Sequence, residues 1–320
     1  MGPNARGALL SLAAFAVYAT HDALVKLMGA GYSPFQLIFF SVLFSFPLAM
    51  GMMIRDPHPG TLMPAHPGWV ALRTGAGVIT GITAFFAFTV LPLAQVYAIV
   101  FATPLIITVL AIPILGERVR IRRWLAVLVG LAGVLIVIQP GQAALTLGHL
   151  AALTAAVGGA VASIIVRRIG QDERPVVLLL YPMIANFMVA GTILPFVYRP
   201  MPIEHLGVMA SMSVLGWAGG VIIILAYKTA EAAVVAPMQY SQIIWATLYG
   251  LIFFGETLDR PTLIGATVII ASGLYIVLRE SRIGAAGTKP VLSSKPRPDT
   301  GTSPKPGLLA RLAQLSRDRT

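Results

Sequence analysis

The feature that most constrains this chain is a series of long apolar stretches, separated by short joints that contain Gly, Pro and charged residues. A helix needs about 20 apolar residues to cross a hydrocarbon core roughly 30 Å thick. Inside lipid the backbone must satisfy its own hydrogen bonds, which a helix does within one segment. We therefore expect an all-α integral membrane protein with ten transmembrane helices. These are expected at Gly7–Gly29, Pro34–Ile54, Trp69–Leu91, Leu93–Leu115 and Trp124–Ile138, and then at Leu147–Ile165, Val176–Tyr198, Leu206–Tyr227, Ala232–Phe254 and Pro261–Leu278.

Composition supports this interpretation and excludes several classes of protein. Hydrophobic residues make up 57% of the chain and charged residues 11%, whereas soluble domains carry roughly 25% charged residues. Mean hydropathy is +0.83. A chain with so few charges cannot cover a folded surface with water-compatible groups, so the lipid bilayer is an expected partner. The absence of cysteine excludes disulfides, iron–sulfur clusters and thiolate zinc sites, and we expect neither a metal nor a cofactor.

Basic residues predict the orientation, because cytoplasmic loops carry an excess of Lys and Arg. With the N-terminus in the cytoplasm, the outer joints hold only Arg199, Arg260 and, near the end of the first helix, Lys26. An even number of helices also puts the basic C-terminal tail inside. We expect a multi-pass protein of the bacterial cytoplasmic (inner) membrane with both termini cytoplasmic. The inner basic residues are Arg6, Arg55, Arg118, Arg120, Arg122, Arg123, Arg167, Arg168, Arg174 and Lys228.

The two ends of the chain each allow two interpretations. Arg6 precedes an Ala-rich apolar run that resembles a signal peptide, but cleavage would leave nine helices, so we expect this helix to be retained. The tail 280–320 is rich in Pro, Ser, Gly and basic residues and is expected to be disordered. Its segment Gly307–Arg319 could instead form an amphipathic helix on anionic lipid. Because the tail carries much of the +11 net charge, nucleic-acid binding is not expected.

Two segments resemble each other beyond their composition. One runs from Ala94 through Pro104 to Gly116-Glu117, and the other from Ala233 to Gly255-Glu256, with the two Gly-Glu pairs 139 residues apart. Five helix crossings separate the pairs, which puts them on opposite sides of the membrane. We therefore expect two five-helix repeats, 7–139 and 145–279, in inverted orientation. Such repeats suit a transporter that opens alternately to each side.

These motifs resemble the EamA-type members of the drug/metabolite transporter superfamily. The resemblance rests on an apolar helix with Pro104 that ends in Gly116-Glu117, followed by a Gly-bearing helix, and on its repetition at Gly255-Glu256. It implies ten helices around a central cavity, with solute export or uptake. The opening His21–Lys26 and the stretch Pro34-Phe35-Gln36 look like S-adenosylmethionine and riboflavin transporter branches. The second repeat has Ile243 where Pro104 would map.

Ionisable residues in the first helix are candidates for a charged cavity or for ion coupling. They are His21, Asp22 and Lys26, and Asp22 and Lys26 are four residues apart, so they share a helix face and can pair. Charged groups in a bilayer are costly and mark solute or proton pathways. On this interpretation Asp22 or His21 binds a cationic group or a coupling proton. The alternative is that the group lies near the helix end, where Lys26 extends to water.

Aromatic and amide side chains on the fourth and ninth helices are candidates for substrate binding. They recur at spacings of three or four residues and so share one face of each helix. Rings with a few polar groups suit a planar or zwitterionic organic solute, although helix packing also explains many such stripes. The fourth helix presents Tyr97, Phe101, Pro104 and Thr108; the ninth presents Met238, Gln242, Trp245 and Tyr249, with Gln239 and Tyr240 close by; Asn186 in the seventh helix is a further candidate.

Three more charged residues have mainly structural interpretations. Glu117 and Glu256 follow helix ends, where a carboxylate can accept hydrogen bonds from the first N–H groups of the next helix; direct contact with a solute is the alternative. Arg73 lies about one turn inside the third helix and is expected to extend to the cytoplasmic interface rather than bind a ligand.

The function expected from the sequence is secondary transport of a small organic metabolite, such as an amino acid, a nucleoside-like or a vitamin-like solute, with proton or ion coupling. A narrower alternative is an S-adenosylmethionine or riboflavin uptake carrier. A membrane-embedded enzyme is the alternative from another class, but it needs a nucleophile–base pair or metal ligands. The five histidines are scattered, none four residues from another. The sequence contains no phosphate-binding Gly-Lys loop, so an ATP-driven pump is not expected.

Overall fold

The computed structural model describes residues 2–54, 62–116, 121–140, 145–170, 172–230 and 232–283, and its regular elements there are all helices. This confirms the all-α prediction. The first half contains α1 (Pro3–Gly29), α2 (Pro34–Ile54), α3 (Pro67–Val90), α4 (Leu93–Val100), α5 (Thr103–Leu115) and α6 (Ile121–Ile138). The second half contains α7 (Leu147–Ile169), α8 (Pro175–Val197), α9 (Ile203–Thr229), α10 (Ala232–Val235), the 3₁₀-helix η1 (Ala236–Ser241), α11 (Gln242–Phe254) and α12 (Arg260–Ile283).

Seven helical segments in the described residues are long and apolar enough to cross a membrane. Two shorter apolar helices, Trp124–Ile138 and Arg260–Ile276, accompany them. Most predicted boundaries agree within a few residues; α9 begins at Ile203 rather than at Leu206. The seven spans are Asn4–Gly29, Pro34–Gly51, Pro67–Val90, Leu93–Leu115, Leu147–Ile169, Val176–Val197 and Ile203–Tyr227.

The two predicted helices that carry the aromatic stripes are interrupted, which the sequence analysis did not foresee. Residues Phe101 and Ala102 form a turn between α4 and α5, and Pro104 occupies the first turn of α5. In the second half, Pro237 lies in the first turn of η1, between α10 and α11. Proline lacks an N–H group and restricts the residue before it. Both interruptions therefore coincide with a proline, although the two prolines are not at equivalent positions.

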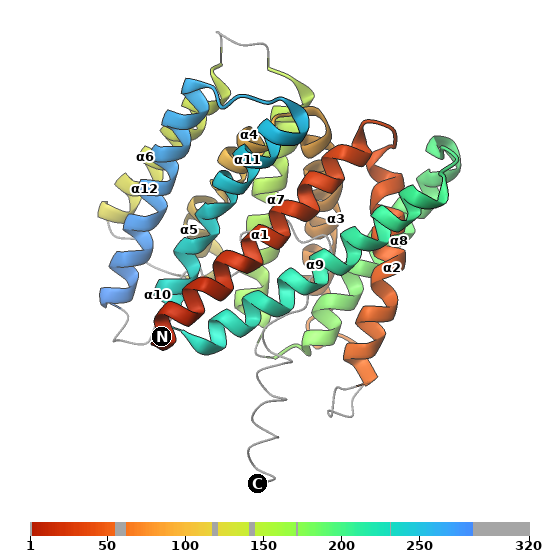
Figure 1. Ribbon diagram of the computed structural model, residues 1–320. Coiled ribbons are helices and arrows are strands. Elements are labelled where there is room, and N and C mark those ends of the chain that lie inside the picture. The colour runs from red at the N-terminus through yellow and green to blue at the C-terminus, as the bar shows by residue number, and fades with distance from the viewer. Residues whose placement is uncertain are drawn as a thin grey trace.

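The helices pack in pairs drawn from both halves of the chain (Figure 1). The most extensive contacts join α1 to α9, α3 to α7, and α6 to α12. Helices α2 and α8 form a further pair, beside α3 and α9. In Figure 1 the α6–α12 pair stands at the left and the α2–α8 pair at the right, with α4, α5, α7 and α11 between them. Nearly all packing is thus between segments far apart in the sequence.

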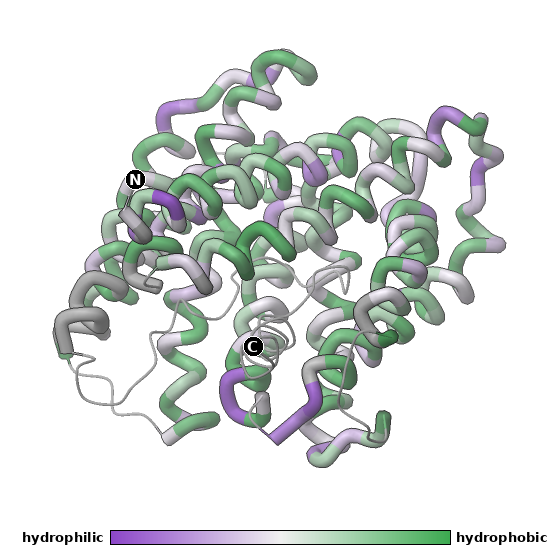
Figure 2. The backbone as a smooth tube through the Cα atoms, turned by 60° about the horizontal axis from the view of Figure 1, so that its bottom comes forward, coloured by the Kyte–Doolittle hydropathy of each residue, from purple (hydrophilic) through white to green (hydrophobic). Residues whose placement is uncertain are grey.

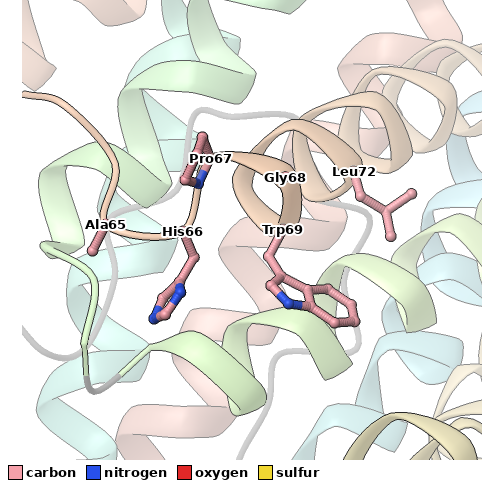
Figure 3. A pocket seen from close by; sticks show the side chains of 6 residues that line it. All are labelled: Ala65, His66, Pro67, Gly68, Trp69 and Leu72. Atoms are coloured by element: carbon pink, nitrogen blue, oxygen red, sulfur yellow. The ribbon is translucent and has the colours of Figure 1, made fainter.

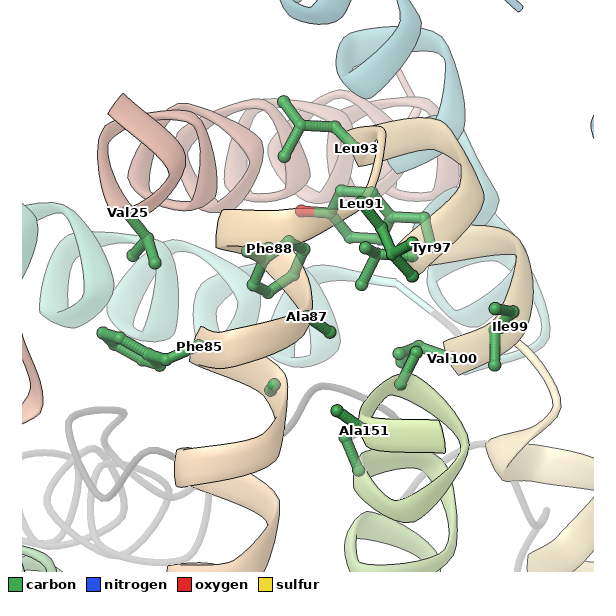
Figure 4. Packing of buried hydrophobic residues seen from close by; sticks show 14 of the residues in the cluster. Val25, Phe85, Ala87, Phe88, Leu91, Leu93, Tyr97, Ile99, Val100 and Ala151 are labelled. Carbon is green, nitrogen blue, oxygen red and sulfur yellow. The ribbon is translucent and has the colours of Figure 1, made fainter. Parts of the chain in front are cut away.

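The largest buried cluster extends through most of the bundle, and Figure 4 shows the part of it formed by α1, α3, α4 and α7. It includes Val25, Phe85, Phe88 and Tyr97, together with Ala151 of α7. Many large apolar side chains instead point outward, such as Phe196, which is 86% exposed. Hydrophilic segments of the backbone trace are few and short, and most of the described chain is apolar or neutral (Figure 2). An outward apolar surface of this kind is expected of a protein surrounded by lipid.

Glycines allow α6 and α12 to approach closely. A Cβ atom built on Gly265 would lie 2.5 Å from the carbonyl oxygen of Gly133, and one on Gly133 would lie 2.9 Å from the carbonyl oxygen of Gly265. Because lipid is as apolar as the helix surfaces, helix association in membranes depends on such close van der Waals packing.

Replacement of Gly265 by Val should therefore push α6 and α12 apart. We expect this overpacking to cost about 1–3 kcal/mol of stability, measured as a lower midpoint of thermal unfolding for the purified protein in detergent. Gly75→Val is the matched control, because Gly75 is an exposed residue of α3 whose Cβ would meet nothing within 4 Å. Equal midpoints for the two variants would contradict the close packing.

Candidate functional site

A buried carboxylate, Asp22 of α1, is the centre of the candidate site. It is 3% exposed. The hydroxyl group of Tyr97 in α4 donates a hydrogen bond to Asp22 Oδ2, and His21 Nδ1 lies 2.7 Å from Asp22 Oδ1. Gln242 of α11 donates from Nε2 to the Tyr97 oxygen over 3.4 Å. Three helices from both halves of the chain thus meet around one acidic group.

The short helix η1 places a second amide beside the first. A 3₁₀-helix has three residues per turn, so side chains at i and i+3 lie above one another. Gln239 is therefore aligned with Gln242, at the junction of η1 and α11. Gln239 is 1% exposed, and its side chain lies beside the Tyr240 hydroxyl, although its Nε2 group makes no hydrogen bond of ordinary geometry within the described residues. The indole N–H of Trp245, one turn further along, has none there either.

Unpaired donors of this kind are costly in an apolar interior, since each loses its hydrogen bonds with water. A ligand with acceptor groups gains the most binding free energy where it pairs with such donors. Together with Asp22, they give the site one negative group and several neutral donors. Such an arrangement can bind a solute that carries both a positive group and an acceptor group.

Aromatic rings line the same region. Phe101 contacts Tyr240 edge to face, with ring centroids 5.1 Å apart. Tyr97 lies 6.1 Å from Phe101 and 5.7 Å from Phe88. Phe101 itself is in the turn between α4 and α5. The predicted substrate-binding residues Tyr97, Phe101 and Tyr240 are therefore neighbours, and Tyr97 links them to Asp22 and Gln242.

Asn186 is the predicted binding residue that the described contacts leave apart from this cluster. It lies on α8, where its Nδ2 donates to the carbonyl oxygen of Pro182 over 2.9 Å. Its Oδ1 faces α3, 3.0 Å from the position of a Cβ atom on Gly81. None of its side-chain hydrogen bonds within the described residues reaches Asp22 or Tyr97.

Lys26 does not form the ion pair with Asp22 that the four-residue spacing makes available. Its ammonium group instead lies 2.7 Å from Glu256 Oε1 and donates to the carbonyl oxygen of Leu91 over 2.5 Å. The reason is that Asp22 is directed toward Tyr97, whereas Lys26 reaches the helix joints one turn away. The expected three-residue charged group is therefore divided between two places.

Glu256 and Arg73 also depart from their sequence interpretation. Glu256 accepts a hydrogen bond from the N–H of Leu93, at the start of α4, rather than from the start of the next helix, α12. Gly116 and Gly255 both adopt left-handed backbone conformations, with φ of 70° and 63°, at the ends of α5 and α11. Glu117 lies outside the described residues. Arg73 was expected at the interface, but it is 2% exposed and donates to the carbonyl oxygen of Leu178 in α8.

Several polar contacts at the Lys26 end of the bundle were not foreseen as a group. The Gln36 amide forms two hydrogen bonds with the backbone of Arg199, of 2.7 and 2.9 Å. The Tyr32 hydroxyl lies 2.6 Å from His205 Nδ1. Gln36 lies in the first turn of an otherwise apolar helix, and a polar side chain in that position is expected to have a hydrogen-bond partner. The sequence could not reveal that this partner is Arg199.

A pocket of about 480 Å³ lies elsewhere, at the start of α3 (Figure 3). It is lined by Ala65, His66, Pro67, Gly68, Trp69 and Leu72. Trp69 also supports the guanidinium group of Arg168, 4.8 Å from the ring centre. Because α3 rises about 1.5 Å per residue, this pocket is more than roughly 20 Å from Phe85, which contacts His21. It is a surface hollow formed by one segment. It does not belong to the group of His21, Asp22, Tyr97, Phe101, Tyr240 and Gln242, called the Asp22 cluster below.

Comparison with known proteins identifies the family. Residues 5–139 and 146–279 each match the EamA-like transporter family. An S-adenosylmethionine uptake transporter of Rickettsia bellii is 26% identical over 266 residues, which cover 82% of this chain and 90% of that protein. A riboflavin transporter of Rhizobium johnstonii is 28% identical, covering 76% of this chain and 79% of that protein. A pseudopaline exporter of Pseudomonas aeruginosa is 23% identical, covering 83% and 94%.

A solved crystal structure has a similar fold, with a TM-score of 0.59 and 19% sequence identity. The match covers 87% of this chain and 99% of that one. The two family matches span most of the chain, and they include all residues of the Asp22 cluster. The chain therefore belongs to the EamA-like transporter family.

Proposed function

We propose that this transporter moves a small zwitterionic or cationic organic metabolite by alternating access, with Asp22, Tyr97, Gln239, Gln242 and Trp245 in its binding site. The observation that carries the proposal is the buried Asp22–Tyr97–Gln242 chain of contacts between helices of both halves. It lies beside two interrupted helical segments, which are the places where membrane carriers commonly build solute sites.

The arrangement of helix pairs supports a ten-helix architecture of two inverted repeats, 7–139 and 145–279. In a two-fold symmetry that exchanges the two repeats, α1 corresponds to α7 and α3 corresponds to α9. The α1–α9 pair then becomes the α7–α3 pair, and both are prominent contacts. The α2–α8 and α6–α12 pairs each convert into themselves. The matching left-handed residues Gly116 and Gly255 are consistent with the same exchange.

The chemistry of the site favours a solute with a positive charge. A carboxylate surrounded by apolar helices is stabilised by a cationic partner, and Asp22 faces hydrogen-bond donors from His21 and Tyr97. The unpaired N–H groups of Gln239 and Trp245 suit a carboxylate or carbonyl of the same solute. The Phe101–Tyr240 ring pair suits an apolar or aromatic part.

Uptake of S-adenosylmethionine or riboflavin is the narrower candidate function, suggested by the relatives of Rickettsia and Rhizobium. Between these two solutes, Asp22 favours S-adenosylmethionine, because that molecule carries a sulfonium cation and an amino-acid group. The aromatic rings alone would suit either.

Loss of the polar side chains of α11 should abolish transport. In proteoliposomes tested with a panel of amines, amino acids, nucleosides and vitamins, Gln242→Ala and Trp245→Ala are expected to lower solute flux at least tenfold while membrane insertion stays intact. Ile244→Ala is the matched control, because Ile244 lies on the same helix and is 67% exposed. Normal flux in both variants would move the binding site elsewhere, and no flux of any solute by the wild type would contradict transport.

Coupling to protons would depend on Asp22. We expect the wild type to accumulate solute in response to a pH gradient and Asp22→Asn to lose that response, since an amide cannot bind and release a proton. The measurement is the initial uptake rate with and without the gradient, at several pH values. The same pH dependence in wild type and Asp22→Asn would remove this residue from the coupling role.

The excess of basic residues at one set of joints supports an inner-membrane location with both termini cytoplasmic. The chain has no cysteine, so single cysteines can report sidedness in intact cells. We expect Tyr198→Cys, at an exposed position after α8, to react with an impermeant maleimide. Thr320→Cys should react only after the membrane is permeabilised. The reverse pattern would invert the orientation.

A further inference from the structure

We propose that Lys26 and Glu256 form a latch that closes the solute path at one end of the bundle and opens during the transport cycle. The name Lys26–Glu256 latch refers to these two side chains together with the backbone groups of Leu91 and Leu93 that they bind. The inference rests on the proposed function only in requiring that a solute path exists.

The latch joins three parts of the chain through five atoms. Lys26 Nζ on α1 lies 2.7 Å from Glu256 Oε1, at the joint between α11 and α12. Lys26 also donates to the Leu91 carbonyl oxygen over 2.5 Å, and the other Glu256 oxygen, Oε2, accepts from the Leu93 N–H over 3.0 Å. Leu91 and Leu93 flank Pro92, at the joint of α3 and α4.

Each charged side chain binds the end of a helix whose partial charge has the opposite sign. The carbonyl groups at the end of α3 carry partial negative charge, and Lys26 binds the last of them, on Leu91. The N–H groups at the start of α4 carry partial positive charge, and Glu256 binds the first of them, on Leu93. Pro92 precedes α4, and no side chain of its own segment caps that helix. Glu256 therefore does from a distance what a local capping residue ordinarily does.

The sequence around Glu256 keeps its side chain in this place. Gly255 adopts a left-handed conformation that turns the chain after α11, and the N–H of Glu256 donates to the Gly250 carbonyl oxygen over 2.9 Å. A Cβ atom on Gly250 would lie 2.8 Å from Glu256 Oε2 and 3.3 Å from its Cβ. Gly250 thus leaves the space that the carboxylate occupies.

The position of the latch connects it to the candidate site. Lys26 is four residues after Asp22 on α1, and Leu93 is four residues before Tyr97 on α4. Both separations are one helical turn, about 6 Å along each axis. The hydrogen bond between Tyr97 and Asp22 joins α4 to α1 directly, and the latch joins them one turn away through Glu256. Separation of the two helices at this end requires that the latch break first.

The two charged side chains of the latch are only partly buried, as expected for an ion pair that forms and breaks during a transport cycle. The Lys26 and Glu256 side chains are 12% and 18% exposed, and the Phe254 ring lies 5.4 Å from the Lys26 ammonium. Water can replace each partner as the charges separate. A fully buried ion pair would instead leave two unpaired charges in an apolar interior.

The test measures access to a buried reporter in the full-length protein, so it does not require the solute to be known. Ala23→Cys, on α1 between Asp22 and Lys26 and 8% exposed, is the reporter in this cysteine-free chain. We expect Lys26→Gln or Glu256→Gln to raise its rate of labelling by an impermeant maleimide at least tenfold. Lys26→Arg, which keeps the charge, should leave labelling slow. Asp259→Asn is the matched control, because it removes an exposed carboxylate three residues from Glu256.

Equal labelling rates in Glu256→Gln and Asp259→Asn would overturn the proposal. A second measurement does not rely on a weakened protein. With Lys26→Cys and Glu256→Cys added to the Ala23→Cys reporter, a bifunctional methanethiosulfonate about as long as the two native side chains together should bridge the two positions and trap the closed end. Labelling at position 23, read by mass spectrometry, should then stop and recover after reduction. Undiminished labelling of the bridged form would also overturn the latch. If solute flux is intact, either of these two labelling results contradicts the latch alone. If the wild type transports no solute at all, the proposed function is contradicted instead.

Discussion

The arrangement of this protein depends on how one acidic side chain is held inside an apolar bundle. Burial of a carboxylate in a membrane-spanning helix is costly, roughly 2.5–3.5 kcal/mol at the helix centre even on insertion scales, and Asp22 is accordingly held by hydrogen-bond donors. His21 supplies one from the same helix and Tyr97 supplies another from α4. Gln242 extends the chain of contacts to α11. These contacts bring helices of both halves together, and the surrounding apolar residues pack around them.

The second constraint is that helix ends inside a membrane protein still need partners for their free backbone groups. At the joint of α3 and α4 those partners come from distant parts of the chain, Lys26 and Glu256. A local cap would have stabilised the joint permanently. Distant caps make its stability depend on how α1 and α11 are placed, so a local helix-end requirement becomes a property of the whole bundle.

Much of the fold could be predicted from the sequence, because apolar length and proline or glycine joints determine where membrane helices begin and end. The breaks at Phe101 and at η1 could not, since a proline within an apolar run is compatible with a kink as well as with an interruption. The candidate residues Tyr97, Gln242 and Asp22 were recognised one by one from their polarity in apolar helices. Their contact was not, because it joins residues 75 and 145 positions apart.

The incorrect predictions for Lys26 and Arg73 have one common cause. Spacing along a helix shows which side chains are able to meet, but not which partner is better. Lys26 could reach Asp22, yet Glu256 and the Leu91 carbonyl together offer it a charge and a helix end. Arg73 could extend to water, yet it binds the Leu178 carbonyl in the adjacent helix. In both cases tertiary contacts provided acceptors that no local pattern shows.

The interrupted helices give a physical reason why this site can change shape while the bundle stays intact. A 3₁₀ segment has poorer hydrogen-bond geometry than an α-helix, so η1 can adjust with less loss than a continuous helix would suffer. Gln239 and Gln242 lie on and beside that segment, and Tyr97 lies one turn before the break that ends α4. One turn of α4 in the other direction reaches Leu93 and the Glu256 carboxylate that binds it. A shift of this short helix therefore changes the binding residues and the closed end together, whereas a continuous helix from 93 to 115 would have to move as one rod.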